Sequence, residues 1–429
     1  MIPVRTALRI MPAAWLALPM AVVAAWYASL LPSPPGYGTA ATAAASGTLP
    51  FIGAFVAGSA AWEGGRLQRA GIWSGPWVRR GARIAAGLLV GPIAAGSVAV
   101  AVAVVVAHAR AGAFPPDLAI LSVMVVDVIT YATVGFALGI VAPLALAVPL
   151  AATLVLFWTA FVPAMYPVWL RHLTGMYRDC CGLAETLAPQ AVVASIVMDV
   201  ALMTAAALAV HVGWRRRWRA AAAATILVAA SLVAIKAASS LTYAPVMARD
   251  PSLLTCTTGN GVEVCVWPEH SRSVTTLVGA ISDVRAKWEA AGIDAPAVFT
   301  EAAGQQPTGT LEVHLPDALT KDGVIVALAV GMLPPAPNCT GTVIQGVQAA
   351  TTGGVAFPYL EAWYAAAGGL SSTASQALDM PGDDINPPVL KVVKELSAAT
   401  VSVRRSWTAN AAAISQSCDD IAPDLRVGN

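Results

Sequence analysis

Residues 62–83, WEGGRLQRAGIWSGPWVRRGAR, form the longest polar interval in an otherwise apolar first half of the chain. The interval contains five arginines and one acid, and arginine-rich intervals between membrane spans stay in the cytoplasm. It therefore decides the sidedness of the spans around it. It is also long enough for a short helix beneath the membrane, from Ala61 to about Ala70, on which Glu63, Arg66 and Arg69 could contact a partner protein. The alternative is a topology signal and linker without a partner.

The composition divides the chain into two parts. Of its 429 residues, 57% are hydrophobic and 11% are charged, whereas about a quarter of the residues in a soluble domain are charged. Acids are scarce before Pro245 and ordinary after it. We therefore predict a multi-span α-helical membrane bundle over residues 1–241 and a soluble α+β domain over residues 242–429. The net charge of +1 does not favour a nucleic-acid partner.

Seven apolar stretches have close to the roughly 20 residues that a helix needs to cross a bilayer. If the arginine clusters at 62–83 and 215–219 are both cytoplasmic, the N-terminus lies inside and the C-terminal domain outside. All six cysteines then fall on the outer side, where disulfides can form. We also expect two short interfacial helices outside, within residues 165–190. The predicted spans are residues 10–31, 41–61, 84–107, 117–138, 144–161, 191–212 and 220–241.

The soluble domain opens with a predicted hairpin, LLTCTTGNGVEVCVW, at residues 253–267. Asn260-Gly261 is a strong signal for a two-residue hairpin turn, and this turn places Cys256 opposite Cys265. Opposed residues on antiparallel strands lie about 4.5–5.5 Å apart at Cα, within reach of a disulfide. The hairpin therefore predicts the bond Cys256–Cys265. Downstream we predict a strand at 310–315 and helices at 273–291, 322–333, 358–367 and from 386 to about 418.

The remaining four cysteines allow three pairings. Cys339 and Cys418 both lie in the soluble domain, and a bond between them would close a long loop, which stabilises a fold by about 4 kcal/mol in the chain-entropy model. Cys180 and Cys181 are neighbours, so a direct bond between them is expected to be strained. We predict the bond Cys339–Cys418. In the alternative, these two pair with Cys180 and Cys181 and hold the soluble domain as a lid over the bundle.

Sequence motifs for catalysis are absent. The chain has no G-x-x-x-x-G-K-[ST] phosphate loop, no H-E-x-x-H and no G-x-S-x-G, and its five histidines are too scattered to indicate a metal site. Glu269-His270, directly after the hairpin, could in principle perform acid–base chemistry, but a polar strand end is the favoured interpretation. We therefore predict that the chain is not an enzyme and holds no cofactor or metal of its own.

Two acids interrupt the apolar spans. Asp127 lies about 10 residues into the fourth predicted span and Asp199 about 9 into the sixth, so both sit about 13–15 Å below the outer face. A charge at this depth costs at least ~2.5 kcal/mol, and such residues usually face the bundle interior or water. Lys236, near the outer end of the last span, is the candidate basic partner. The three residues are predicted to form an intramembrane polar site, either a transport or proton site or a hydrogen bond that determines helix packing.

The order of these features resembles one family, the type-2 ABC exporter permeases whose ATPase is a separate chain. Three features carry the resemblance over about half of the chain. They are the cytoplasmic interval 62–83 between spans two and three, the turn GFALGIVAPLALAVP at 135–149 between spans four and five, and the outer segment 165–190 between spans five and six. The family usually ends inside after span six, whereas this chain adds a seventh span and an outer domain.

The resemblance implies the permease subunit of a bacterial ABC-type exporter in the cell membrane. On this interpretation the chain forms a dimer, a cytoplasmic ATPase subunit binds the ATP, and the helix at residues 63–70 takes up the motion of that subunit. The alternative is a membrane-anchored extracytoplasmic ligand-binding or sensor protein whose permease-like bundle no longer transports. An extracytoplasmic hydrolase would be a third class, but no motif supports it.

Overall fold

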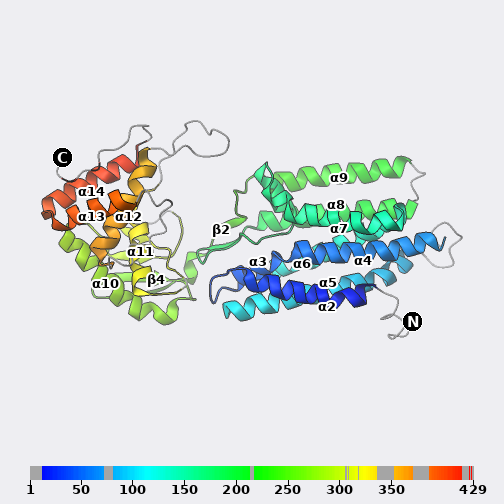
Figure 1. Cartoon of the computed structure of the whole chain (residues 1–429), viewed down its shortest axis with the longest axis horizontal. Helices are drawn as coiled ribbons and strands as arrows, with labels where there is room; N and C mark the ends of the chain where they lie inside the picture. Colours follow the sequence, from blue (N-terminus) through cyan, green and yellow to red (C-terminus); the bar gives the residue numbers. More distant parts are fainter. Residues whose placement is uncertain are drawn as a thin grey trace. The chain divides into compact units, whose positions relative to one another are not determined.

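The structure is a computed structural model in which the chain separates into two compact units, Met1–Met247 and Ala248–Asn429 (Figure 1). The predicted division lies six residues earlier, between residues 241 and 242. The structure describes residues 12–71, 81–212, 217–304, 307, 309–316, 318–335, 352–370, 386–417, 425 and 427. We describe each unit by itself.

The first unit is a bundle of long apolar helices that lie side by side (Figure 1). Among the described residues, six helices are long and apolar enough to cross a membrane, and a seventh span results if the bent pair α3 and α4 counts as one. A helical bundle with about seven candidate spans therefore agrees with the prediction. The helices are α2 (Pro12–Leu30), α3 (Gly38–Ser46), α4 (Leu49–Arg69), α5 (Gly81–Ala111), α6 (Leu118–Val141), α7 (Leu144–Ala160), α8 (Pro189–Val212) and α9 (Arg217–Ala238).

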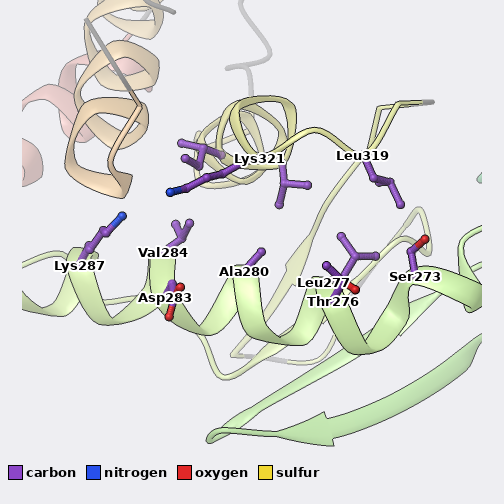
Figure 2. A pocket seen from close by; sticks show the side chains of 11 residues that line it. Ser273, Thr276, Leu277, Ala280, Asp283, Val284, Lys287, Leu319 and Lys321 are labelled. Atoms are coloured by element: carbon purple, nitrogen blue, oxygen red, sulfur yellow. The ribbon is translucent and has the colours of Figure 1, made fainter.

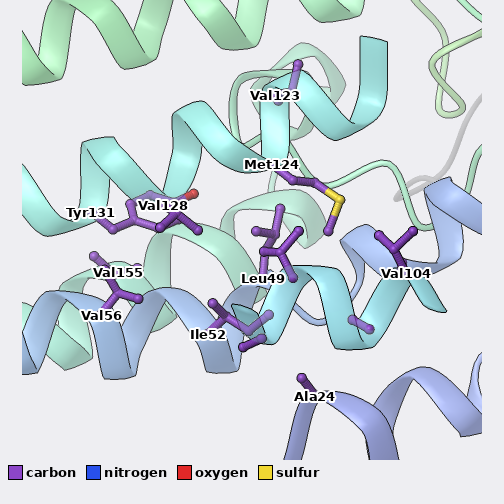
Figure 3. Packing of buried hydrophobic residues seen from close by; sticks show 14 of the residues in the cluster. Ala24, Leu49, Ile52, Val56, Val104, Val123, Met124, Val128, Tyr131 and Val155 are labelled. Atoms are coloured by element: carbon purple, nitrogen blue, oxygen red, sulfur yellow. The ribbon is translucent and has the colours of Figure 1, made fainter. Parts of the chain in front are cut away.

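Helices α4 and α6 pack closely because small residues line their interface. A side chain at Gly135 or Gly139 of α6 would collide with the carbonyl oxygens of Ala57 or Ala61 on α4, and one at Gly64 would collide with the backbone of α6. Small residues allow such close approach of helix backbones within a membrane. Larger apolar side chains fill the space beside this contact, and Figure 3 shows part of the resulting cluster.

The predicted short helix beneath the membrane is not a separate element. Helix α4 continues without a break from Leu49 to Arg69, so the expected start of a new helix at Ala61 is wrong. Gly64 and Gly65 keep α4 packed against α6 and Leu144 of α7, and nothing in this stretch ends the helix. The bend in the second span lies instead between α3 and α4, at 46°. The rest of the polar interval, residues 72–80, lies outside the described residues.

The segment between α7 and α8 contains two 3-10 turns and a short strand rather than two regular interfacial helices. The turns are η2 (Val162–Ala164) and η3 (Val168–Leu173), and the strand β1 (Glu185–Leu187) pairs with β2 (Val246–Ala248). A disulfide joins Cys180 and Cys181 in this segment.

This bond is compatible with the favoured pairing of Cys339 with Cys418, which leaves Cys180 and Cys181 over. Because Cys180 and Cys181 are bonded to each other, neither is available for the alternative in which they hold the soluble domain as a lid. The predicted partners Cys339 and Cys418 lie outside the described residues.

The second unit contains a four-stranded sheet whose strand order follows the sequence: β3 (Thr255–Gly259), β4 (Val262–Val266), β5 (Val298–Thr300) and β6 (Thr310–Glu312). Strands β3 and β4 are antiparallel, and the other neighbours are parallel. Asn260 and Gly261 both have positive φ, as the predicted turn requires. Cys256 lies opposite Cys265 and is bonded to it, so the hairpin register and this disulfide are confirmed.

Helices cover this sheet, with an apolar core between them. The predicted amphipathic helix is α10 (Val274–Ala291), whose predicted apolar stripe is buried and which ends at Gly292 with φ 85°. Trp288 and Trp363 are among the largest buried side chains of this core. The other helices are α11 (Lys321–Gly331), α12 (Thr352–Gly368), α13 (Asn386–Ala398) and α14 (Val401–Ser415), each close to a predicted helix.

Candidate functional site

The structure brings together the two acids of the predicted intramembrane site. Asp127 on α6 is 1% exposed and Asp199 on α8 is 2% exposed, and their carboxyl groups lie next to each other. The Oδ2 atom of each carboxyl has no hydrogen-bond partner within the described part of the chain. A buried carboxyl oxygen that lacks a donor is costly, so this pair is an unusual feature of an otherwise apolar bundle.

Hydroxyl groups from the same face of α6 surround the acid pair. The Tyr131 hydroxyl donates to Asp127 Oδ1 at 3.1 Å, and Thr130 lies beside Asp199. Asp127, Thr130 and Tyr131 are spaced i, i+3 and i+4, so one face of α6 presents all three. Both tyrosine and threonine can donate to a carboxylate and accept from a protonated acid. The site can therefore accommodate either protonation state of the acid pair.

Residues 172–177, the end of the 3-10 turn η3 and the four non-helical residues that follow it, lie against the acid pair, and we refer to them as the plug segment. Its Gly175 has a φ of 69°, and a side chain there would collide with the Asp127 carboxyl group. The carbonyl of Thr174 accepts from the Tyr131 hydroxyl at 3.4 Å. The backbone N–H of Tyr177 donates to Ser46 Oγ at 2.8 Å, at the end of α3.

The plug segment reaches well into the bundle. The Tyr177 hydroxyl lies 2.8 Å from Ser195 Oγ, and Ser195 is about 9 Å along α8 from its first residue. Asp199 lies one turn further along the same helix. Non-helical backbone at this depth is tolerated only where protein buries it or water-filled space borders it. Here His172, Leu173, Thr174 and Tyr177 are all buried.

Polar groups within the plug segment are neutral. Burial lowers the pKa of His172, with Arg171 nearby acting in the same direction, and the hydrogen bond to the Thr242 carbonyl offsets this only in part. His172 Nε2 therefore donates to that carbonyl at 2.8 Å from a neutral ring. Burial also raises the pKa of the Tyr177 phenol, which stays protonated. Uncharged hydrogen bonds thus hold the plug segment over the acid pair.

Lys236 does not join the acid pair, so this part of the predicted site is wrong. Its side chain is exposed, and no ion pair links it to Asp127 or Asp199. Ala234 and Ala238 form the buried face of α9, and a residue midway between them points to the opposite side of the helix. The position of Lys236 on its helix therefore turns it away from α8.

The predicted partner contact at the end of α4 divides into a buried and an exposed part. Glu63 is 2% exposed and pairs with Arg66 at 3.3 Å, so it lies inside the bundle rather than on a contact surface. The small residues Gly64 and Gly65 draw this turn of α4 against its neighbours, which buries Glu63. Arg66 and Arg69 remain exposed.

The Glu269-His270 pair separates into two different interactions. Arg249 donates to both carboxylate oxygens of Glu269 at 3.0 Å, whereas His270 Nδ1 lies 2.7 Å from Glu301. The second oxygen of Glu301 accepts from the backbone N–H of Trp267 at 2.8 Å. These bonds connect the end of β4 to the segment after β5, as expected for a polar strand end.

Members of the site that are absent from the sequence prediction include Thr130, Tyr131, Thr174, Gly175 and Tyr177. The spacing of Tyr131, one turn after Asp127, is the one signal that could have indicated its role. Thr174, Gly175 and Tyr177 lie 47 or more residues from Asp127 in the sequence, and no local pattern connects them to it.

Comparison with known proteins finds a similarity in part of the second unit. A family model described as a domain of unknown function (DUF7224) matches residues 264–418, which begin in strand β4 and extend just beyond α14. No curated protein and no solved structure matches the chain.

Proposed function

We propose that the chain is the permease subunit of a bacterial ABC-type exporter that works with a separate cytoplasmic ATPase subunit. In this proposal the acid pair is a polar step of the transport path, and the plug segment is the outer gate above it. The observation that carries the proposal is the plug segment itself, a buried stretch without regular α-helix that covers two carboxyl groups in the interior of a bundle of candidate spans.

The energetics of the acid pair favour a functional role over a packing role. Replacing a buried charged or polar group by a well-packed apolar one is often neutral or stabilising, so two adjacent buried acids are a poor way to hold helices together. The plug segment, in contrast, is held by separate neutral hydrogen bonds, each contributing about 1 kcal/mol. Such bonds can break and re-form as a gate opens, and opening would let water and substrate reach Asp127 and Asp199.

Helix α4 offers a direct mechanical connection from the gate to the cytoplasmic side. Near its outer end, Gly53 packs so closely against the Tyr131 ring that a side chain there would collide with it. Its inner end carries the exposed Arg66 and Arg69, about 24 Å away along the helix axis. Because α4 is continuous, a force on its inner end would shift its contact with Tyr131, the residue that bonds both Asp127 and the plug segment.

The test is co-purification of an ATPase that depends on Arg69. The tagged full-length chain would be purified in mild detergent from its native membranes, and the ATP hydrolysis of the preparation would be measured. We expect Arg69→Glu to remove most of this activity and the co-purifying nucleotide-binding subunit. Arg66 is left unchanged because it pairs with the buried Glu63, so that its reversal would also damage the fold.

The matched control is Arg110→Glu. It reverses the charge of an exposed arginine in the last turn of α5, at the end that is predicted to lie outside. It should leave hydrolysis and subunit content unchanged. A preparation of the unaltered chain without ATP hydrolysis, or equal loss in both variants, would contradict the proposal.

The alternative function, a membrane-anchored ligand-binding protein, is favoured by one observation: the second unit contains a pocket between α10 and α11. A chain that binds a ligand there but co-purifies with no ATPase would support this alternative over the exporter.

A further inference from the structure

The pocket in the second unit has a volume of about 370 Å³ and lies between α10 and α11 (Figure 2). This volume is at the lower end of the range of small-molecule sites. Both helices belong to one compact unit and to the part of the chain that the family match covers. The pocket is far in sequence from the acid pair, and the proposed transport path does not use it.

The pocket is a long groove with an apolar floor. Leu277 and Val284 from α10 and Val324 and Ile325 from α11 line it, and all four are almost fully buried. The lining residues on α10 run from Thr276 to Lys287, which corresponds to about 17 Å along the helix. An elongated apolar molecule would therefore cover more of this floor than a compact one.

Ala280 creates the open space in the middle of the groove. It lies between Leu277 and Val284 on the same face of α10, and its side chain is the smallest of the three. A larger side chain at this position would occupy the groove without disturbing the apolar contacts beneath it.

Positive charge gathers at one end of the groove. Figure 2 shows the ammonium groups of Lys287 and Lys321 pointing toward the same end, whereas Ser273 and Leu319 lie at the other. Lys287 donates to the carbonyl of Gly368 at 3.3 Å, and within the described residues Lys321 has no ion-pair partner. Asp283 also lines the pocket but forms no ion pair with either lysine. The two lysines therefore outnumber the single acid and favour an anion.

We propose that this groove binds an elongated apolar molecule with one anionic head group, of the kind represented by a medium-chain carboxylate. The apolar chain lies along Leu277, Ala280 and Val284, and the carboxylate accepts from Lys321 and Lys287. Because the binding site is separate from the acid pair, this proposal does not depend on the exporter function and would stand if no ATPase were found.

The test measures binding of radiolabelled decanoate to the full-length chain in nanodiscs, with empty nanodiscs as the blank. We expect saturable binding that Ala280→Phe weakens at least about tenfold, because the new ring fills the groove. Lys321→Glu should weaken binding about threefold or more, since it replaces an attractive charge by a repulsive one. Lys394→Glu, a charge reversal on exposed α13 outside the pocket, is the matched control and should change nothing.

Decanol separates charge recognition from apolar burial. It has the same chain without the charge and should bind more weakly than decanoate to the unaltered protein and equally well to both lysine variants. Intact folding of each variant is checked by circular dichroism and by the presence of the Cys256–Cys265 bond. Absence of saturable decanoate binding, equal binding of decanol and decanoate, or equal effects of Lys321→Glu and Lys394→Glu would each overturn the proposal.

Discussion

Gly175 holds the plug segment against the acid pair because it has no side chain. Its φ of 69° disfavours other residues, and a Cβ atom would also collide with the Asp127 carboxyl. We expect Gly175→Ala to lower the free energy of unfolding by the ~1 kcal/mol of an unfavourable φ plus a further loss from the collision. Thermal unfolding of the purified protein in detergent measures this loss.

Gly112→Ala is the control for this prediction. Gly112 has a similar φ of 62°, but no atom lies within 4 Å of the position of its Cβ. Gly112→Ala should therefore lower the free energy of unfolding only by the ~1 kcal/mol of an unfavourable φ. The double variant Gly175→Ala with Asp127→Ala should recover part of the loss, because it removes the carboxyl group that the methyl group meets. Equal melting temperatures for the two glycine variants would show that the close approach has no energetic importance.

His172 should make stability depend on pH. Burial lowers its pKa in the folded protein, whereas the unfolded chain has the ordinary value of about 6.5. The unfolded state therefore binds more protons as the pH falls below about 6.5, and stability falls until the pH reaches the lower folded pKa. We expect the melting temperature to drop between pH 7.5 and pH 5, and the drop to be smaller in His172→Gln.

Glutamine at position 172 can still donate to the Thr242 carbonyl but cannot gain a proton in this range. His314→Gln is the control, because the His314 side chain is 67% exposed and belongs to the second unit. An identical drop in both variants would mean that other groups cause the pH dependence.

At the scale of elements, the contact between α4 and α6 depends on glycine. A methyl group at Gly139 would collide with the carbonyl of Ala61, so Gly139→Ala should destabilise the bundle by about 1–3 kcal/mol, the usual cost of overpacking. Gly87→Ala, on α5 with open space around it, should be neutral or stabilising by about 0.5–1 kcal/mol. Gly139→Ala should therefore lower the melting temperature and Gly87→Ala should not, and an equal decrease in both variants would contradict this interpretation.

The hairpin β3–β4 should contribute to the stability of the second unit through its disulfide. Removing the bond with Cys256→Ala and Cys265→Ala is expected to cost about 2–4 kcal/mol. Urea unfolding followed by tryptophan fluorescence reports on this unit, because Trp267 and Trp288 are fully buried in it. An unchanged midpoint would mean that the turn and the sheet contacts maintain the register without the bond.

For the whole molecule, the sidedness of the two units is a prediction that labelling can test. The positive-inside rule places Gln68 in the cytoplasm and the second unit outside. Cysteines introduced at the exposed positions Gln68 and Ser252 should therefore differ toward a membrane-impermeant maleimide. In intact cells Ser252→Cys should react and Gln68→Cys should react only after lysis. The reverse pattern would invert the topology and remove Arg69 from the cytoplasmic side.

Features that depend on local patterns could be predicted from the sequence. Apolar length indicated the candidate spans, because a helix that crosses a bilayer needs about 20 apolar residues wherever it lies in the chain. The Asn260-Gly261 turn indicated the hairpin register, because side chains alternate along a strand and the turn sets which residues are opposed. The apolar stripe of α10 followed from its helical period.

Features that depend on which surfaces meet could not be predicted in this way. The sequence indicates that Asp127 and Asp199 are polar residues at equal depth. It does not indicate the plug segment beside them, because that segment contacts residues far from it in the sequence. Lys236 is the only lysine or arginine within a predicted span, which makes it the candidate partner from sequence, whereas the face of α9 that packs against α8 is decided by neighbouring alanines. Likewise, α4 continues as a helix to Arg69 because Gly64 and Gly65 allow it to pack closely against α6 and α7. Local patterns thus specify each helix and its depth, and only the packing of one helix against another decides which side chains form the site.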